Sequence, residues 1–313
     1  MLFDIARLLI GGLMLYFGAK WLVRGAAGLA RAFGVPPLVI GLTVVSYGTS
    51  APELAVSVAA ALDGKSDIAI GNVVGSNGAN IGLILGITAL IAPPKVDPTL
   101  IRREIPWLML ATFAVPLVML GGQIGRIEGA LLTIGAVAFT WLTLRGARPG
   151  DGEQAELDDL EESRGRLALL GFFVVGLGVL VWGGDVFVDG AVGVATRYGM
   201  SERVIGLTIV AVGTSLPELA ASLVAALRGH SELAVGNVVG SNLFNILLIL
   251  GVTSLVRPIP TGFSSVPVDL LMLGVVTVAC AVSMRKARTI GRPEGGFYIL
   301  IYAAFIGLVA VFG

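Results

Sequence analysis

The chain has 313 residues, of which 56% are hydrophobic and 13% charged, and its mean hydropathy is +0.92. This composition excludes an ordinary soluble domain and points to membrane-spanning segments. The 21 basic and 21 acidic side chains give a formal net charge of zero, so nothing favours nucleic-acid binding.

A membrane-spanning helix needs about 20 predominantly apolar residues. Ten segments come close to this length: 3–32, 36–62, 66–92, 99–120, 126–145, 166–196, 201–227, 231–256, 265–284 and 294–312. We therefore predict an all-α integral membrane protein with ten transmembrane helices. The first segment lacks a strongly basic start and a clear cleavage site, so we expect a retained helix and not a signal peptide.

The distribution of Lys and Arg predicts the orientation of the chain. The connections that follow the odd-numbered segments, with the adjoining helix ends, carry 15 of these residues, and the opposite side carries 6. Positive side chains favour the cytoplasmic side. We expect a multi-pass protein of the cell (inner) membrane with both termini extracytoplasmic.

An acidic stretch divides the chain into two halves. Residues 149–163 hold seven acids and read as a cytoplasmic linker between a first five-helix repeat, 1–148, and a second, 164–313. A calcium-sensing loop is the alternative, although the ligand spacing of a known calcium-binding loop is missing.

The two halves contain the same sequence. Residues 41–88 align with 206–253 without a gap, and 32 of 48 positions are identical. Five predicted helices precede the linker and five follow it, and an odd number per half makes the second half enter the membrane upside down. Inverted repeats with interrupted helices at matching places indicate a transport site near the middle of the membrane.

Each copy holds a carboxylate inside an apolar segment, beside residues that break helices. Gly48-Thr49-Ser50-Ala51-Pro52-Glu53 matches Gly213-Thr214-Ser215-Leu216-Pro217-Glu218. An acid within the membrane is costly and marks an ion or proton path by default. Each proline should interrupt its helix and free carbonyls, around Ser46 to Gly48 and around Ala211 to Gly213. Those carbonyls would join the hydroxyl and carboxylate oxygens of the motif as hard ligands.

The next helix of each half adds further oxygens. Ser76 and Asn80 lie one turn apart, as do their counterparts Ser241 and Asn245. His and Cys are missing from this set, which favours alkali or alkaline-earth cations over Zn, Cu or Fe. Two ionised glutamates carry a charge of −2, which one Ca²⁺ or two Na⁺ neutralise equally, and competition between these loads would produce exchange.

Several other polar residues have weaker signals. For Asn72, Asn77, Asn237 and Asn242 a structural hydrogen bond between helices is at least as good an interpretation as ligation. We expect His230, beside Arg228, at the surface of a loop. Asp185 and Asp189, near the outer end of the sixth segment, either line an access route or simply meet solvent.

The paired motifs Gly-Thr-Ser-x-Pro-Glu-Leu and Gly-Asn-Val-Val-Gly-Ser-Asn resemble those of the calcium/cation antiporter superfamily, specifically prokaryotic sodium/calcium exchangers. The resemblance implies alternating access, in which the first and sixth helices slide across a rigid body of eight helices. It implies Ca²⁺ coordination by Glu53 and Glu218. It also implies Na⁺ sites built from Thr49, Ser50, Ser76, Thr214, Ser215, Ser241 and the carbonyls of Ser46 and Ala211.

One position departs from the family pattern. Exchangers of this type can carry an Asp where this chain has Asn245. The centre of the predicted site is therefore symmetric, with Glu53, Asn80, Glu218 and Asn245, and it lacks one potential acid.

We interpret the chain as a secondary active antiporter exchanging Na⁺ for Ca²⁺. The alternatives are a Ca²⁺/H⁺ antiporter, in which the two glutamates take up protons, and a passive cation channel. No motif of an intramembrane enzyme was found, so we expect no enzymatic activity and no cofactor. The expected partners are Ca²⁺ and Na⁺ as substrates and the lipid bilayer, with the monomer as the functional unit because one chain contains both halves of the site.

Overall fold

The computed structural model describes residues 1–147, 165–200, 211–262 and 266–312, without the side chains of residues 211 and 310–312. The predicted acidic linker, 149–163, and the first ten residues of the predicted seventh helix lie outside the described residues. The described part is almost entirely helical, as predicted.

The helices of the first half are α1 (Leu2–Ala32), α2 (Pro37–Ile40), η1 (Gly41–Val45), α3 (Ser46–Thr49), α4 (Ala51–Leu62), α5 (Ser66–Ala79), η2 (Asn80–Leu85), α6 (Gly86–Ile91), η3 (Leu100–Glu104), α7 (Ile105–Val118) and α8 (Arg126–Arg145). Those of the second half are α9 (Arg166–Arg197), α11 (Ala211–Gly213), α12 (Leu216–Leu227), α13 (Ser231–Phe244), η6 (Asn245–Ile249), α14 (Leu250–Val256), α15 (Pro267–Lys286) and α16 (Arg292–Phe312). The segments labelled η are short π-helical stretches. Two short strands, β1 (Gln123–Ile124) and β2 (Ile259–Pro260), pair antiparallel and join the ends of α8 and α14.

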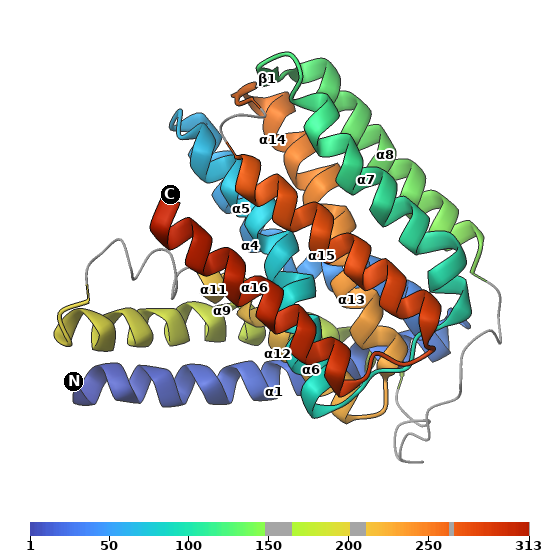
Figure 1. Cartoon of the computed structure of the whole chain (residues 1–313). Coiled ribbons are helices and arrows are strands. Elements are labelled where there is room, and N and C mark those ends of the chain that lie inside the picture. Colours follow the sequence, from blue (N-terminus) through green and yellow to red (C-terminus); the bar gives the residue numbers. More distant parts are fainter. Residues whose placement is uncertain (148–164, 201–210, 263–265, 313) are drawn as a thin grey trace.

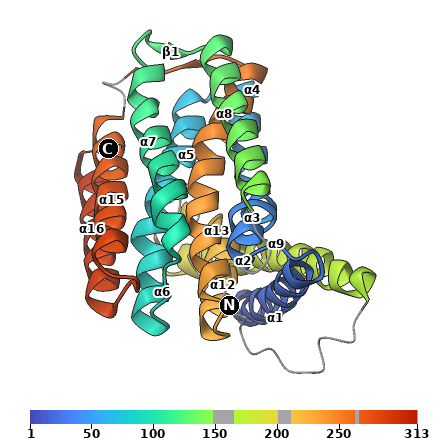
Figure 2. The same cartoon turned by 90° about the vertical axis from the view of Figure 1, so that its right-hand side faces the viewer.

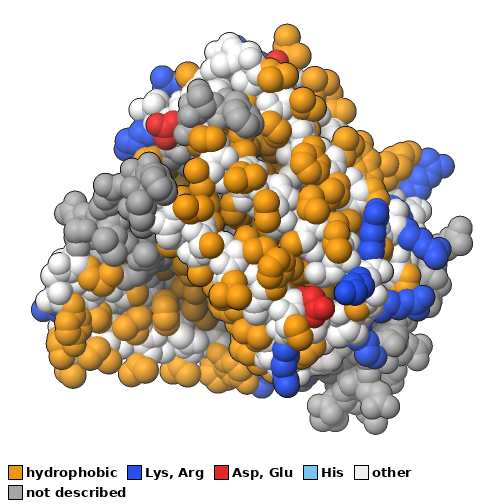
Figure 3. Space-filling model, in the orientation of Figure 1, with side chains coloured by type: hydrophobic (Ala, Val, Ile, Leu, Met, Phe, Trp, Pro, Cys, Tyr) orange, Lys and Arg blue, Asp and Glu red, His pale blue; other side chains and the backbone are white. Residues whose placement is uncertain are grey.

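Six helical stretches of the described chain are long and apolar enough to cross a membrane: Leu2–Ala32, Ser66–Ile91, Arg126–Arg145, Arg166–Arg197, Ser231–Val256 and Pro267–Lys286. A bent pair, Pro37–Thr49 with Ala51–Leu62, raises the number to as many as seven. Figure 3 shows hydrophobic side chains over most of the visible face, which is the surface that a lipid-embedded protein needs. The protein is therefore an integral membrane protein.

The long helices differ in how deeply they lie within the molecule. The stretches that begin at Ser66 and Ser231 are 72% and 83% buried, whereas α1, α8 and α9 are 28–33% buried. The two central stretches are the ones that carry the predicted asparagine ligands. Figure 2 shows α5 and α13 flanked by α7, α8, α15 and α16, while α1 and α9 cross the bundle at a steep angle.

Helices α1 and α9 lie side by side and antiparallel (Figure 1). Glycines at every seventh position of each helix face the backbone of the other: Gly11, Gly18 and Gly25 of α1, and Gly176, Gly183 and Gly190 of α9. A Cβ atom on Gly18 would lie 2.6 Å from the amide nitrogen of Leu180, and one on Gly183 would lie 2.9 Å from that of Leu15. Small residues thus let the two backbones touch.

These contacts are reciprocal. Gly18 and Gly183 are 165 residues apart, and so are their partners Leu15 and Leu180. The offset is the one that relates the repeated motifs, so the repeat extends into α1 and α9.

Candidate cation site

Both copies of the motif interrupt a helix at the same place. Helix α3 ends at Thr49 and α4 begins at Ala51, with Ser50 at φ −89° and ψ 8° between them. In the second half α11 ends at Gly213 and α12 begins at Leu216, with Ser215 at φ −93° and ψ 6°. The axis bends by 45° at the first break. The predicted interruptions are therefore confirmed.

The carbonyl groups at the first break differ from the expectation. The amide of Ser50 donates to the carbonyl of Ser46 at 3.0 Å, so that carbonyl is not free of backbone partners as predicted. The reason lies in the register: proline at position 52 removes the donor for the carbonyl four residues earlier, which belongs to Gly48 and not to Ser46. The hydroxyl of Thr49 also donates to the Ser46 carbonyl, at 3.4 Å, so this oxygen has two partners within the chain. The carbonyl of Ala211 belongs to the first residue of the short helix α11.

The two glutamates lie at the starts of α4 and α12, and each is only 1% exposed. Ser50 of the first half donates to Oε1 of Glu218 of the second half at 2.9 Å. The Oε2 atoms of Glu53 and Glu218 have no hydrogen-bond partner within the described chain. A buried carboxylate is stable only with a partner of opposite charge, a hydrogen bond or a proton. The free oxygens are therefore available to a cation.

The central helices bring the remaining predicted oxygens to this region. Ser76, Asn80, Ser241 and Asn245 are all at most 6% exposed. In the described chain the buried polar atoms without a partner include Oδ1 of Asn80, both amide atoms of Asn245, and the hydroxyls of Ser215 and Ser241. A buried polar atom without a partner costs about 1–3 kcal/mol, and native structures contain few of them. Their concentration among the predicted ligands fits a site for hard cations.

Asn72 and Asn237 hold the broken helices to the central ones. Nδ2 of Asn72 donates to the carbonyl of Glu53 at 3.0 Å and to the hydroxyl of Ser57 at 2.8 Å. Asn237 donates to the hydroxyl of Ser222 at 2.9 Å in the same way. Thr49 also donates to Oδ1 of Asn237, at 3.4 Å, across the two halves. The structural interpretation of these asparagines is thus the one that the contacts favour.

Sequence reasoning missed the two serines in these contacts. Ser57 and Ser222 lie one turn after each glutamate, are fully buried and are identical in the two copies. Their identity within the repeat was the available signal. Asn77 and Asn242 also behave alike, since each donates to the carbonyl four residues earlier in its own helix.

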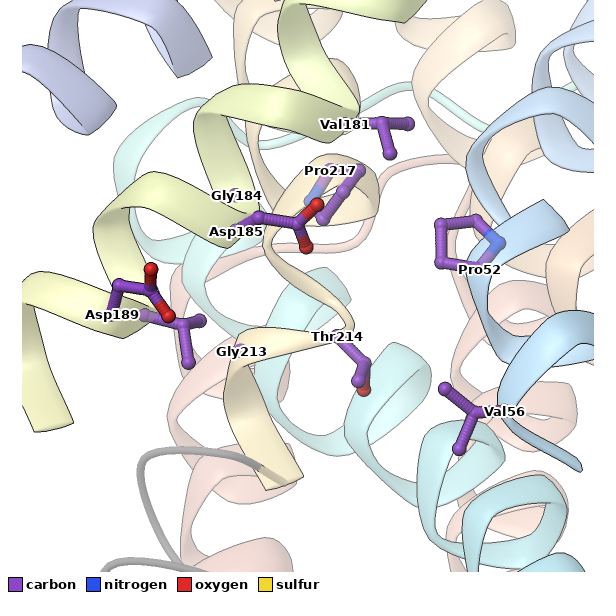
Figure 4. Close-up of a pocket in the computed structure, with 10 residues that line it drawn as sticks. Pro52, Val56, Val181, Gly184, Asp185, Asp189, Gly213, Thr214 and Pro217 are labelled. Carbon is purple, nitrogen blue, oxygen red and sulfur yellow. The ribbon is translucent and has the colours of Figure 1, made fainter. Parts of the chain in front are cut away.

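A cavity of about 290 Å³ opens next to both motifs. Its lining consists of Pro52, Val56, Val181, Gly184, Asp185, Val188, Asp189, Gly213, Thr214 and Pro217. Figure 4 shows Asp185 and Asp189 on one helix, α9, facing the motif residues Thr214 and Pro52 across the cavity. Of the predicted ligands, Thr214 is half-buried and lines this cavity, while Thr49, its counterpart, is fully buried. The two aspartates therefore line a cavity beside both motifs, and they are also exposed.

One expectation outside the site is wrong. His230 was expected at the surface, but it is 5% exposed and precedes the first residue of α13. Burial, together with the positive charges of Arg31 and Arg228, lowers the pKa of His230 to about 4. The imidazole is therefore neutral at physiological pH and packs as part of the turn between α12 and α13.

Known proteins resemble the whole of this chain. Residues 3–145 and 168–311 match the family described as sodium/calcium exchanger protein. Inner membrane protein YrbG of Escherichia coli is 36% identical over 99% of this chain and 97% of its own length. Sodium/calcium exchanger MaX1 of Methanosarcina acetivorans is 32% identical, with 96% of each chain covered.

The structure has a matching counterpart as well. The sodium-calcium exchanger NCX_Mj superposes with a TM-score of 0.86 at 32% identity, over 98% of this chain and 99% of the other. The matches span both halves and include both broken helices. This chain is an integral membrane antiporter of cations including Ca²⁺, and it belongs to the sodium/calcium exchanger protein family.

Proposed function

We propose that this protein exchanges Na⁺ for Ca²⁺ across the membrane by alternating access. The observation that carries the proposal is a pair of fully buried glutamates, one from each copy of a repeated motif, among buried oxygens without partners. We assign Ca²⁺ to Glu53 and Glu218 with Asn80 and Asn245 beside them. We assign Na⁺ to sites formed by the hydroxyls of Thr49, Ser50, Ser76, Thr214, Ser215 and Ser241 and the carbonyls of Ser46 and Ala211.

The architecture that accompanies this proposal has ten transmembrane helices in two inverted repeats, 1–148 and 164–313, joined by a cytoplasmic linker, 149–163. The reciprocal contacts of α1 and α9 support a two-fold relation between the halves. The hydrogen bond from Ser50 to Glu218 supports one shared site at their junction, so the monomer is the proposed functional unit. The excess of basic residues on one side supports both termini outside the cell, and the similarity to an inner membrane protein supports that location.

Alternating access is supported by a difference between the two sides. The cavity residues Val56 and Val188, which are not buried, have counterparts 165 residues away at Ala221 and Val23. These two counterparts are at most 2% exposed. A cavity open toward one side and packed shut at the equivalent place favours an alternating-access transporter over the channel alternative.

Proton coupling is the second candidate, and a specific residue favours it. Asn245 stands where family members can have an Asp, so the site has two carboxylates, and two protons would replace one Ca²⁺ with equal charge. The hydroxyls beside each glutamate favour Na⁺ instead, because a proton needs no hydroxyl ligands.

The deciding experiment is ⁴⁵Ca²⁺ uptake into proteoliposomes loaded with Na⁺, compared with liposomes loaded with acid. We expect uptake that follows the outward Na⁺ gradient and is insensitive to a proton uncoupler. Uptake driven only by the H⁺ gradient would replace Na⁺ coupling by proton coupling. Uptake that needs no counter-ion, and that collapses a Ca²⁺ gradient passively, would indicate the channel.

A further inference from the structure

The acids at the cavity have basic counterparts on the other side of the molecule. Residues 18–35 align with 183–200 at the same offset of 165 residues that relates the motifs. In this alignment Lys20 matches Asp185, and Arg24 matches Asp189. The repeat therefore preserves the glycines that pack α1 against α9 but reverses the charge at two positions between them.

The surroundings of these positions are equivalent as well. Arg7 lies 3.9 Å from Asp189, and the residue that matches Arg7 in the second half is Phe172. Phe172 receives the guanidinium of Arg24, whose Cζ lies 4.9 Å from the ring centroid. One end of the helix pair thus joins an arginine to Asp189, and the other joins an aromatic ring to the matching Arg24.

The charges differ in how they face the transport site. Asp185 and Asp189 line the open cavity beside the motif residues Pro52 and Thr214 (Figure 4). Asp189 is 65% exposed and partly offset by Arg7, which is itself 40% exposed. No ion pair involves Asp185 within the described chain, so it contributes the larger part of the negative potential at the cavity.

We propose that Asp185 and Asp189 form an acidic vestibule that concentrates cations at one face of the exchanger, while Lys20 and Arg24 hold the equivalent positions on the opposite, closed side. When the molecule opens to the other side, the two-fold relation puts the basic pair where the acidic pair now stands. The exchanger then binds cations at lower concentration from the acidic side and releases them readily at the basic side. The overall equilibrium is unchanged, because the ion gradients alone set it.

This inference rests on the proposed exchange, and it makes a quantitative demand. A local potential enriches an ion by a Boltzmann factor that depends on its charge. If the vestibule lowers the apparent KM for Na⁺ by some factor, it lowers that for Ca²⁺ by the square of the factor. Salt screens such potentials, because the Debye length falls from about 30 Å at 0.01 M to about 10 Å at 0.1 M.

The test is the initial rate of ⁴⁵Ca²⁺ and ²²Na⁺ uptake in right-side-out and inside-out membrane vesicles, at low ionic strength and with added choline chloride. Charged clefts of this kind raise association rates by about tenfold or more. For Asp185→Asn with Asp189→Asn we therefore expect the apparent KM for Ca²⁺ to rise about three- to tenfold at the acidic face. The KM at the other face should not change. Choline chloride at 0.1 M should remove most of the difference from the wild type.

Two further variants should lower the apparent KM for Ca²⁺ instead of raising it. Arg7→Gln should lower the Ca²⁺ KM at the acidic face, because it removes the partner of Asp189. Lys20→Gln should lower the KM at the basic face. The matched control is Asp67→Asn, which neutralises an exposed acid that does not line the cavity and should leave both KM values unchanged.

The outcomes separate this inference from the proposed function. Wild-type vesicles without Na⁺-driven Ca²⁺ uptake would remove the proposed Na⁺ coupling. Normal coupling with unchanged KM values in the aspartate variant would overturn the vestibule alone. Equal changes for Na⁺ and Ca²⁺ that resist choline chloride would also overturn it, since they indicate altered packing of α9.

Discussion

The glutamates are the residues on which the proposed exchange depends. Glu53 and Glu218 are buried from water to the same extent, Ser50 of the opposite half donates to Oε1 of Glu218, and Oε2 of each glutamate has no partner within the described chain. Burying an unpaired carboxylate costs several kcal/mol, so each glutamate is a poor choice for stability alone. A bound cation would offset this cost in the proposed site.

We expect Glu53→Gln and Glu218→Gln to abolish Ca²⁺ exchange while leaving the protein folded, because each change removes a buried charge and keeps the shape. Proteoliposome ⁴⁵Ca²⁺ uptake measures the activity, and thermal unfolding in detergent without Ca²⁺ measures the stability. Normal Ca²⁺ turnover by either variant would remove that glutamate from the site. A variant that fails to fold would show that the charge is structural.

The serines beside the glutamates form a matched pair. The hydroxyl of Ser50 donates to Glu218, whereas the hydroxyl of Ser215 is buried without a partner in the described chain. Removing a donor from a charged acceptor costs about 1.5–3 kcal/mol. In the absence of ions, Ser50→Ala should therefore lower the free energy of unfolding by about that amount, and Ser215→Ala should change it much less. Equal effects in chemical denaturation would mean that the bond seen between the halves does not contribute.

At the level of helices, the packing of α1 against α9 decides whether the two can act as one unit. Their glycines repeat every seven residues, which keeps one face of each helix in contact with the other along its length. Side chains larger than hydrogen at these positions would force the backbones apart.

We expect Gly183→Leu to lower the melting temperature and to eliminate transport, because a Cβ at this position would lie 2.9 Å from the backbone of Leu15. Overpacking of this kind costs about 1–3 kcal/mol. Gly178→Leu, on the same helix, is the control, because a Cβ at this position would meet no neighbouring atom within 4 Å. If both variants transported Ca²⁺ at the wild-type rate, close contact of α1 and α9 would not be required for function.

The sequence was informative where local chemistry decides the structure. Pro52 and Pro217 predicted both helix breaks, because a missing amide acts within four residues. The partner of each glycine in α1 and α9 could not be predicted, since composition indicates close packing but not which helices approach. The burial of His230 also depends on how a turn packs against distant arginines. The hydrogen bond between Ser50 and Glu218 could not be predicted either, because it depends on how the two halves pack together, which local sequence rules do not determine.

For the molecule as a whole, the two halves are similar in sequence but not in their present environments. The Cβ of a residue at position 48 would meet Leu177, and one at position 213 would meet Val188, so both motif glycines contact α9 at different points. In the proposed inverted-repeat architecture, exchanging these unequal contacts between the halves produces a second arrangement, which is the one that alternating access requires.

This relation predicts which residues become accessible in the second arrangement. Val56 lines the cavity and is 39% exposed, while its counterpart Ala221 is 2% exposed. Neither belongs to the proposed ligands, and the lone cysteine, Cys280, is completely buried, so it should give little background labelling. We expect Val56→Cys to react with a membrane-impermeant thiol reagent from the cavity side only, and Ala221→Cys to react only from the opposite side and only while Ca²⁺ is being exchanged. Mass spectrometry of vesicles labelled from each side checks this.

Simultaneous reaction of both cysteines without substrate would indicate a continuous pore, because a pore exposes both sides of the site at once. Reaction of Ala221→Cys from the same side as Val56→Cys would instead contradict the inverted relation of the halves, since it would put the two counterparts on one face of the membrane.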